Sequence, residues 1–172
     1  RRGMDLVVLQ PSNVVAALAE PAVPLLGLLS AIGRRHFVWF GAADGWINYV
    51  AVEDVAAAIA EAALRGPADT TFILNTPQRL DQMVQWCAQL LGVPVPSRRV
   101  PLWAGRVAAR AGDVAAALGR TVPFDSNRLR EMTTTTRYDG SGLQRVTGFD
   151  YPLGVRAMLV RLVDRYRREG RL

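Results

Sequence analysis

Hydrophobic residues along the chain occur in short unbroken runs and at helix-spaced positions, and together these patterns predict an α/β fold. The runs at 5–10 (DLVVLQ) and 71–74 (TFIL) do not alternate with polar residues, which is typical of parallel strands covered by helices on both faces. Between them, residues 53–64 have helical spacing, with one apolar face formed by Val55, Ala58, Ile59, Ala62 and Ala63. We expect the two strands to lie parallel and adjacent or nearly so, with this helix in the crossover.

The rest of the chain is predicted to be mostly helical. Helices are expected at 21–33, 79–91, 102–118, 125–132, 139–146 and 152–168, and Gly105 and Gly112 are expected to interrupt the third. Extended segments are expected at 36–40, 48–52 and 133–137, and a loop at 11–18. Glu53 and Asp54 fall in the first turn of the helix at 53–64, where carboxylates offset the helix dipole. We interpret this pair as a charged helix start rather than as an acid and a base for catalysis.

Composition narrows the chemistry that the chain can perform. The 172 residues are 50% hydrophobic, which is enough for one domain with a core. All 21 basic residues are arginine, so the chain has no Schiff-base lysine and no phosphate-loop lysine. The single cysteine, Cys87, and the single histidine, His36, exclude a disulfide within the chain and a zinc site. We interpret both as structural residues and expect a cytoplasmic protein.

Charge and hydropathy argue against nucleic-acid and membrane partners. The net charge is +6, but the arginines are scattered outside the last helix and form no basic stripe interleaved with aromatic residues. The most apolar stretch, at 22–33, is too short to span a bilayer. We therefore expect neither a nucleic acid nor a membrane as partner.

Four segments, in order, resemble the C-terminal half of the extended short-chain dehydrogenases/reductases, the NAD(P)-dependent epimerase/dehydratase family. LVVLQPSNVV at 6–15 resembles the family's L-R-P-S-N-V-Y-G-P, and INYVAVEDVAAAI at 47–59 resembles V-H-V-D-D-V-A-x-A. Residues 71–92 resemble the family's next strand, turn and helix, and TTRYDGSGLQRVTGFDYP at 135–152 resembles its D-x-S-K-L-x-x-x-L-G-F-x-P ending. The resemblance covers nearly the whole chain.

The resemblance implies the C-terminal part of a Rossmann-like, doubly wound parallel sheet plus a small, mostly helical substrate-binding lobe. The chain is then one segment, 1–172, with sheet-contributing parts at about 4–15 and 53–92 and the lobe at about 16–52 and 93–172. It further implies that the nicotinamide of NAD or NADP lies against four loop residues, Pro11, Ser12, Asn13 and Val14. Gln10 and Asn13 would face the substrate, because ligands of such sheets bind at the carboxyl ends of strands.

Arginines of the lobe are the candidates for binding the diphosphate of a nucleotide sugar. The resemblance assigns this role to Arg128 or Arg130, with Arg98 or Arg99 as a lesser candidate, since the planar guanidinium suits phosphate oxygens. Ile47 stands where the family has a second arginine. Two alternatives therefore stay open: a family member that acts on a smaller or apolar alcohol or carbonyl, steroid-like in kind, and a non-catalytic binding protein with the same fold.

The catalytic groups of the family lie upstream of the region that this chain resembles. The sequence has no Gly-rich phosphate loop and no Tyr-x-x-x-Lys pair, so we expect it to hold no catalytic residue and to be inactive alone. The abrupt start at Arg1 is interpreted as a cut or an ordering boundary. The expected partners are a missing N-terminal cofactor-binding half and a small-molecule substrate, and a homodimer is left open.

Overall fold

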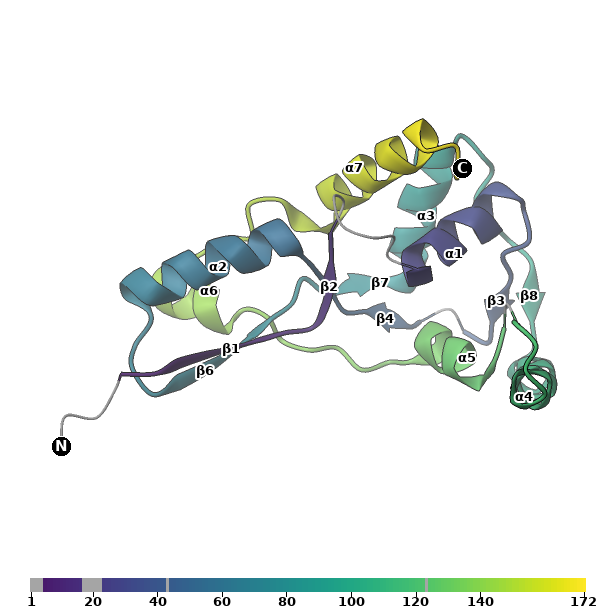
Figure 1. The fold of residues 1–172 in the computed structure, drawn as a ribbon, viewed down its shortest axis with the longest axis horizontal. Coiled ribbons are helices and arrows are strands. Elements are labelled where there is room, and N and C mark those ends of the chain that lie inside the picture. Colours follow the sequence, from purple (N-terminus) through teal and green to yellow (C-terminus); the bar gives the residue numbers. More distant parts are fainter. Residues whose placement is uncertain (1–4, 17–22, 43, 123) are drawn as a thin grey trace. The chain divides into compact units, whose positions relative to one another are not determined.

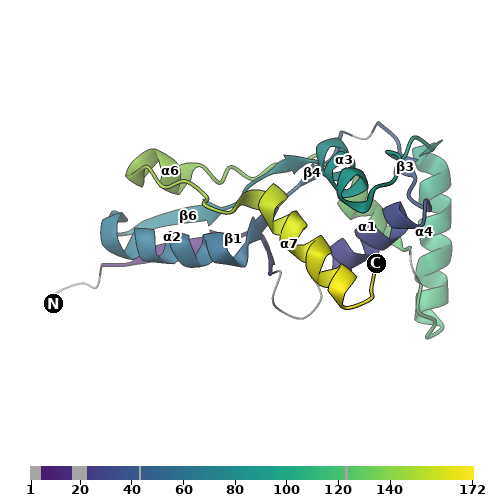
Figure 2. The ribbon, with the colours of Figure 1, turned by 90° about the horizontal axis from the view of Figure 1, so that it is seen from above.

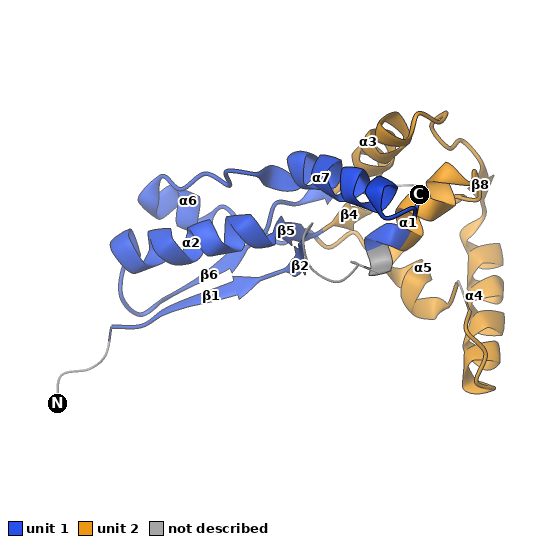
Figure 3. Cartoon of the chain, turned by 45° about the horizontal axis from the view of Figure 1, so that its top comes forward, with its two compact units in different colours: residues 1–26, 48–78, 137–172 blue, residues 27–47, 79–136 orange. Residues whose placement is uncertain are grey.

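A computed structural model describes residues 5–16, 23–42, 44–122 and 124–172 of the chain (Figure 1). These residues fall into two compact units (Figure 3). Unit 1 comprises Arg1–Leu26, Asn48–Gln78 and Arg137–Leu172, and unit 2 comprises Gly27–Ile47 and Arg79–Thr136. The division into sheet part and substrate lobe expected from the sequence stays a prediction.

Each unit contains parallel strands and several helices. Unit 1 contains β1 (Val7–Pro11), β2 (Asn13–Val15), β5 (Tyr49–Ala51), α2 (Val52–Arg65), β6 (Thr70–Leu74), α6 (Gly142–Thr147) and α7 (Gly154–Arg168). Unit 2 contains β3 (Trp39–Phe40), β4 (Trp46–Ile47), α3 (Leu80–Leu91), β8 (Arg99–Val100), α4 (Leu102–Ala117) and α5 (Ser126–Thr133). The bounds of α1 (Val23–Gly33) and β7 (Gln78–Arg79) cross from one unit to the other.

The main strand pair of unit 1 is β1 with β6. The two strands are parallel, with Val7 opposite Thr70 and Pro11 opposite Leu74, and α2 lies between them in the chain. This confirms the parallel neighbours and the crossover helix predicted from the two apolar runs. A second parallel pair, β2 with β5, aligns Asn13 with Tyr49. The prediction of a loop at 11–18 was therefore wrong at β2, where the chain makes a further short strand directly after β1.

Only one face of the β1–β6 pair is covered by the described residues. Phe72 and Leu74 are buried in a core with Ala58 and Ala62 of α2 and Leu143 of α6. Figure 3 shows α2 and α6 on this side of the pair. Side chains on the opposite face are exposed: Leu6 (50%), Val8 (36%) and Ile73 (38%). The expectation that both faces are buried was therefore wrong within the part of the chain that the structure describes.

A buried carboxylate joins the start of α2 to the start of α7. Asp54 is fully buried, and its two oxygens accept hydrogen bonds from the backbone N–H groups of Leu153 (2.7 Å) and Gly154 (3.0 Å). These are among the first N–H groups of a helix, which have no acceptor within the helix itself. Asp54 lies in the first turn of α2, as predicted, and the structure adds that it is buried: it lies one and two turns before Ala58 and Ala62, on the covered face of the helix.

The helix α7 is amphipathic, as the sequence predicts. Its apolar residues Val155, Leu159, Leu162, Val163 and Tyr166 are all buried. Arg156, Arg161, Arg167 and Arg168 are exposed. Figure 2 gives a second view of this helix, coloured yellow. Burial of this face supplies hydrophobic stabilisation that helix propensity alone does not.

In unit 2, α4 runs without a break through the two glycines that were expected to interrupt it. A Cβ on Gly105 would lie 2.6 Å from the Phe40 ring, and a Cβ on Gly112 would collide with the Phe124 carbonyl oxygen. The glycines therefore allow close packing rather than a kink, since a helix tolerates glycine at a cost of about 1 kcal/mol. The strands β3 and β8 of this unit pair in parallel, with Trp39 opposite Arg99.

Smaller differences concern the ends of elements. The strand expected at 36–40 is limited to β3, and His36 lies outside it with an exposed side chain. The segment 134–137 forms no strand. No helix among the described residues is long and apolar enough to cross a lipid bilayer.

The hydrogen bonds from the start of α7 to Asp54 of α2 predict that substitution of Asp54 strongly lowers stability. Asp54→Ala leaves two backbone N–H groups without their acceptor, so we expect the free energy of unfolding to fall by about 2–4 kcal/mol. Glu53→Ala is the matched control, because Glu53 pairs only with Arg161 at 3.5 Å near the surface and such pairs contribute at most about 1 kcal/mol. Urea unfolding followed by circular dichroism measures both; equal effects of the two substitutions would contradict the role of Asp54.

Candidate functional site

The candidate site lies in unit 1, where the parallel strands β1 and β6 end. Ser12 and Asn75 directly follow the two strands, and the Ser12 hydroxyl donates a hydrogen bond to Asn75 Oδ1 (2.8 Å). The Ser12 N–H continues the strand pairing by donating to the Leu74 carbonyl (2.9 Å). Carboxyl ends of parallel strands are the usual ligand-binding edge of an α/β sheet.

Asn75 is the centre of a buried hydrogen-bond network at this edge. Its side chain is 1% exposed, and its amide donates to Asn48 Oδ1 (3.0 Å) and to the Tyr138 carbonyl (2.8 Å). Its Oδ1 accepts from Ser12, so both amide hydrogens and the amide oxygen are engaged. A buried amide in this state is fixed in one orientation, because any rotation leaves polar atoms without partners.

Asn48 links the same network to the next strand pair. Its Oδ1 accepts from Asn75 and from the Tyr138 N–H (3.0 Å), and its backbone carbonyl accepts from the Asn13 side-chain amide (3.1 Å) and N–H (3.3 Å). The two asparagines therefore fix the segment 12–13, the end of β6 and the segment near Tyr138 together.

A tyrosine and a glycine complete the packing around Asn75. The Tyr151 hydroxyl accepts from the Asn75 N–H (3.2 Å) and donates to the Gly140 carbonyl (2.8 Å). Gly140 passes so close to the Asn75 backbone that a Cβ there would collide with the Asn75 carbonyl oxygen. Burial raises the pKa of Tyr151, so its hydroxyl stays protonated and serves the structure.

The loop residues predicted to border a cofactor are brought to this edge and remain accessible. Pro11, Asn13 and Val14 are exposed and Ser12 is half-buried, although the backbone of the loop is held by the bonds described above. Gln10 is exposed and lies opposite Ile73, on the uncovered side of the strand pair. The edge therefore presents a rigid backbone with free side-chain surfaces, which is what a planar ligand needs for close contact.

The predicted arginines all lie in unit 2, in different surroundings. The Arg128 guanidinium is about one-third exposed, pairs with Glu131 at 3.3 Å, and lies 3.2 Å from where a Cβ on Gly27 would be. At the start of α5, the Asp125 carboxylate caps the helix by accepting from the Arg128 backbone N–H (2.8 Å). Arg130 and Arg98 are both exposed. The Arg130 guanidinium donates a long hydrogen bond to Asn127 Oδ1 (3.5 Å).

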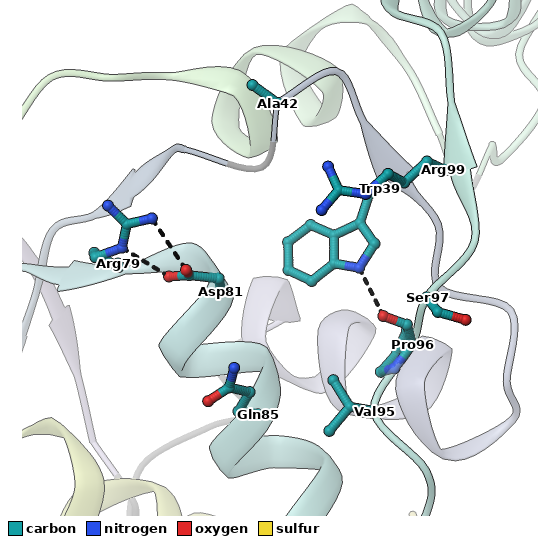
Figure 4. Close-up of a pocket in the computed structure, with 9 residues that line it drawn as sticks. All are labelled: Trp39, Ala42, Arg79, Asp81, Gln85, Val95, Pro96, Ser97 and Arg99. Atoms are coloured by element: carbon teal, nitrogen blue, oxygen red, sulfur yellow. Dashed lines mark hydrogen bonds and ion pairs between the residues drawn. The ribbon is translucent and has the colours of Figure 1, made fainter.

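Unit 2 also contains an open pocket of about 370 Å³ between α3 and the segment 95–99 (Figure 4). Trp39 forms one wall, and its indole N–H donates to the Pro96 carbonyl (2.7 Å). Arg79 is neutralised by Asp81 at 3.0 Å, whereas Arg99 lines the pocket with no ion pair among the described residues. The sequence named Arg99 only as a lesser candidate beside Arg98, and the structure places Arg99 in the pocket.

Cys87 is the one cysteine of the sequence, and it is buried. Burial raises the pKa of the Cys87 thiol to about 12, so it is a packing residue of α3, as interpreted from the sequence. No group of histidine, cysteine or carboxylate side chains among the described residues could hold a metal ion.

Sequence reasoning missed the residues that organise this edge. Asn48 was assigned only to an extended segment and Asn75 only to a turn, since asparagine after a strand is usual in turns. The available signal was that each asparagine directly adjoins an apolar strand, Tyr49–Ala51 and Thr70–Leu74. A polar residue at the end of a buried strand must find partners inside the protein.

Comparisons with known proteins agree with this geometry. No protein-family model and no curated protein matches the sequence. Among solved structures, the chain is similar to a nucleoside-diphosphate-sugar epimerase from Pseudomonas aeruginosa, with a TM-score of 0.64, 20% identity, and coverage of 99% of this chain and 50% of that chain. It is also similar to a dTDP-glucose 4,6-dehydratase from Streptomyces venezuelae solved with NAD bound (TM-score 0.58, 15% identity, 96% and 44% coverage). A third is a UDP-glucose 4-epimerase from Thermotoga maritima (TM-score 0.56, 17% identity, 97% and 47% coverage).

These likenesses confirm the fold expected from the four sequence segments. The chain spans about half the length of the structures that it matches. Its α/β arrangement with short parallel strand pairs is similar to the fold of about half of each of these structures.

The hydrogen-bond network around Asn75 predicts that replacing its amide with a carboxyl group lowers stability, and that the loss depends on pH. Asn75→Asp replaces the donating amide with a carboxylate that faces the oxygens of Asn48 and Tyr138, so the folded state raises the pKa of the introduced group. We expect the variant to be less stable than the parent at pH 7, by about 2–4 kcal/mol, and the deficit to shrink as the pH falls and the carboxyl is protonated.

The control for this experiment is Asn127→Asp on the exposed surface of α5, which should change stability little at either pH. Thermal unfolding at pH 5 and pH 7 measures both variants. A deficit of Asn75→Asp that is independent of pH would show that the amide hydrogens do not matter.

Proposed function

We propose that this chain is the substrate-side half of an NAD(P)-dependent enzyme that acts on a nucleotide sugar as an epimerase, dehydratase or reductase. The observation that carries the proposal is the fold match to such enzymes, with the ligand edge at 10–14 held rigid by Asn48 and Asn75 and still accessible. A likeness at 15–20% identity establishes only the fold, so the activity rests on what the edge offers.

The uncovered face of β1 and β6 supports a further half of the enzyme. Leu6, Val8 and Ile73 form an apolar surface at the centre of what would otherwise be a sheet core. Among the described strands β1 pairs only with β6, so one of its edges also has free backbone groups. An uncovered apolar face and a free edge are liabilities that proteins normally cover, and a cofactor-binding half that extends the sheet covers both.

The residues at the strand ends fit a nicotinamide cofactor. Pro11, Asn13 and Val14 expose a fixed surface beside the uncovered face, and no acidic side chain of the described part interrupts the segment 10–15. The chain would hold the nicotinamide end of NAD or NADP there, and the cofactor would supply hydride transfer. The pyrophosphate needs a glycine-rich loop at a helix N-terminus, which this sequence lacks, so we assign it to the other half.

Arg128 is the arginine that we assign to an anionic part of the substrate. It is half-buried, lies in the capped first turn of α5 and is given room by Gly27, whereas Arg130 and Arg98 are exposed. A guanidinium that is positioned before binding loses less conformational freedom when it contacts a phosphate.

The second candidate is an enzyme of the same fold with a smaller or apolar alcohol or carbonyl substrate. It is favoured by Ile47, which stands where the family has a second arginine, because one arginine alone neutralises only part of a diphosphate. A non-catalytic binding protein remains the third candidate.

The proposal predicts a difference in cofactor binding between the chain and the longer protein. We expect the full-length protein to bind NADH or NADPH with micromolar affinity, and the 172-residue chain alone to bind more weakly, because the phosphate loop is absent from it. Isothermal titration calorimetry measures both. Micromolar binding by the isolated chain, or its absence from the full-length protein, would contradict the division of roles.

The substrate assignment predicts a selective effect of one arginine. In the full-length protein, Arg128→Ala should weaken the binding of a nucleoside-diphosphate sugar by about ten- to a hundredfold, because one charge-assisted hydrogen bond is lost. The affinity for NAD(P)H should stay unchanged. The exposed Arg120→Ala serves as the control. If the Arg128→Ala variant binds nucleotide sugars as tightly as the unsubstituted protein, the enzyme with a smaller or apolar substrate becomes the better candidate.

A further inference from the structure

The helix α4 exposes a row of large apolar side chains that no described residue covers. Trp103 is 69% exposed, Val107 64%, Val114 62% and Leu118, just after the helix, 76%. Their spacing of four, seven and four residues places them in one row along the helix. We call these four residues the apolar row of α4. Large exposed apolar side chains that gather on one helix face commonly mark an interaction site.

The opposite face of α4 is firmly packed, so the row is not a consequence of a loose helix. Gly105 and Ala109 are buried, and the Gly105 and Gly112 backbones lie against Phe40 and Phe124, whose rings stack with centroids 5.0 Å apart. Figure 3 shows α4 at the margin of unit 2, beside α5. The packed glycine face fixes the rotation of the helix and thereby keeps the apolar row outward.

We propose that the apolar row is an interface with a second copy of this chain, in which the two α4 helices pack antiparallel about a two-fold axis. This interface is independent of the proposed function, because none of its residues belongs to the ligand edge. A two-fold axis pairs a surface with itself, so the surface must be self-complementary. The charges and the side-chain sizes along α4 both meet this condition.

The charge complementarity comes from Arg106 and Asp113. They lie seven residues apart on one flank of the apolar row, and in an antiparallel helix pair residues of this flank face the same flank of the partner. Arg106 of each copy then faces Asp113 of the other, which gives two equivalent ion pairs. In a parallel pair of helices, Arg106 of one copy would not face Asp113 of the other.

Both charges are free to make this contact. Arg106 has no ion pair among the described residues. Asp113 accepts from the Ser126 N–H (3.0 Å) and hydroxyl (2.5 Å), which fixes the carboxylate at the helix surface. An ionised carboxylate can accept about four hydrogen bonds, so it retains capacity for a guanidinium.

The size complementarity comes from the other flank, which carries only small side chains. Ala104, Ala108, Ala111 and Ala115 follow the apolar row along the helix. Alanines on this flank allow the two helix axes to come close, so that Trp103 of one copy reaches Val114 of the other. Arg110 lies on the same face between Val107 and Val114, and it can extend its aliphatic stem along the interface and keep its head in water.

A second copy fits these features better than a membrane surface does. A helix that lies in a bilayer interface carries basic residues along its polar face. Here the flank with Arg106 also carries the acidic Asp113, the other flank carries alanines, and the face opposite the apolar row is packed through glycines against Phe40 and Phe124. Because a single pair of helices buries less than the roughly 800 Å² per partner of a standard interface, we expect a dissociation constant in the micromolar range.

Sedimentation velocity of the full-length protein over a range of concentrations tests the interface. We expect a monomer–dimer equilibrium that Val107→Glu and Val114→Glu each weaken by at least about tenfold, since each places two carboxylates in the apolar contact. Leu64→Glu, at an exposed apolar residue of α2, is the matched control and should leave the equilibrium unchanged. Arg106→Glu should weaken the dimer, and the double variant Arg106→Glu/Asp113→Arg should restore it.

Disulfide cross-linking tests the antiparallel arrangement separately. The native Cys87 is buried, so an introduced thiol reacts alone. With Arg106 of one copy facing Asp113 of the other, the two-fold axis passes next to residue 110, so Arg110→Cys should cross-link to its own copy on oxidation, whereas the two copies of Leu118→Cys lie roughly 25 Å apart and should not. A protein that is monomeric at all concentrations, a dimer insensitive to Val107→Glu and Val114→Glu, or a monomer that binds anionic phospholipid vesicles through the apolar row would each overturn the proposal.

Discussion

Two buried side-chain amides hold the ends of the parallel strands, and the accessible edge depends on them. Asn75 and Asn48 satisfy each other and connect Ser12, Asn13 and the Tyr138 backbone. An apolar residue in place of Asn75 would remove the partner of the Ser12 hydroxyl and of the Tyr138 carbonyl, and one in place of Asn48 would remove the acceptor of the Tyr138 N–H. The network fixes the edge geometrically without using the outward surfaces of Pro11, Asn13 and Val14, and these surfaces stay available to a ligand.

The sequence allowed the pairing of β1 with β6 and the helix between them to be predicted, because unbroken apolar runs with a long connection permit few topologies. It did not allow the open face to be recognised, because Leu6, Val8 and Ile73 are as apolar as the residues that are buried. The position of Asp54 in the first turn of α2 was predicted, but its burial was not, because its role as an acceptor depends on the distant segment at 153–154. Gly105 and Gly112 were misread because close contacts with Phe40 and Phe124 leave no local trace in the sequence.

Part of the candidate site followed from the sequence and part did not. The segment 10–14 was located by motif, and the structure puts it at a strand end where ligands of such folds bind. The residues that support it, Asn48 and Asn75, belong to segments 27 positions apart, and their contact depends on the tertiary fold. Among the arginines, the sequence treated Arg128 and Arg130 as equal candidates. Local packing against Gly27 distinguishes them, since it restrains Arg128 and leaves Arg130 in solvent.

The interleaving of the two units along the chain also sets an order for folding during synthesis. Unit 2 has all its residues once the ribosome has passed residue 136, whereas unit 1 lacks 137–172 until the end. Until then the core side of β6 has no α6, so Phe72 and Leu74 lie without their cover of Leu143 and Phe149. Pairings between segments so distant in sequence close slowly, and partly covered strands are the species most prone to aggregate. The nascent chain therefore passes through a stage in which one face of its main strand pair is open and the other is covered by α2 alone, and chaperone binding at that stage would protect it.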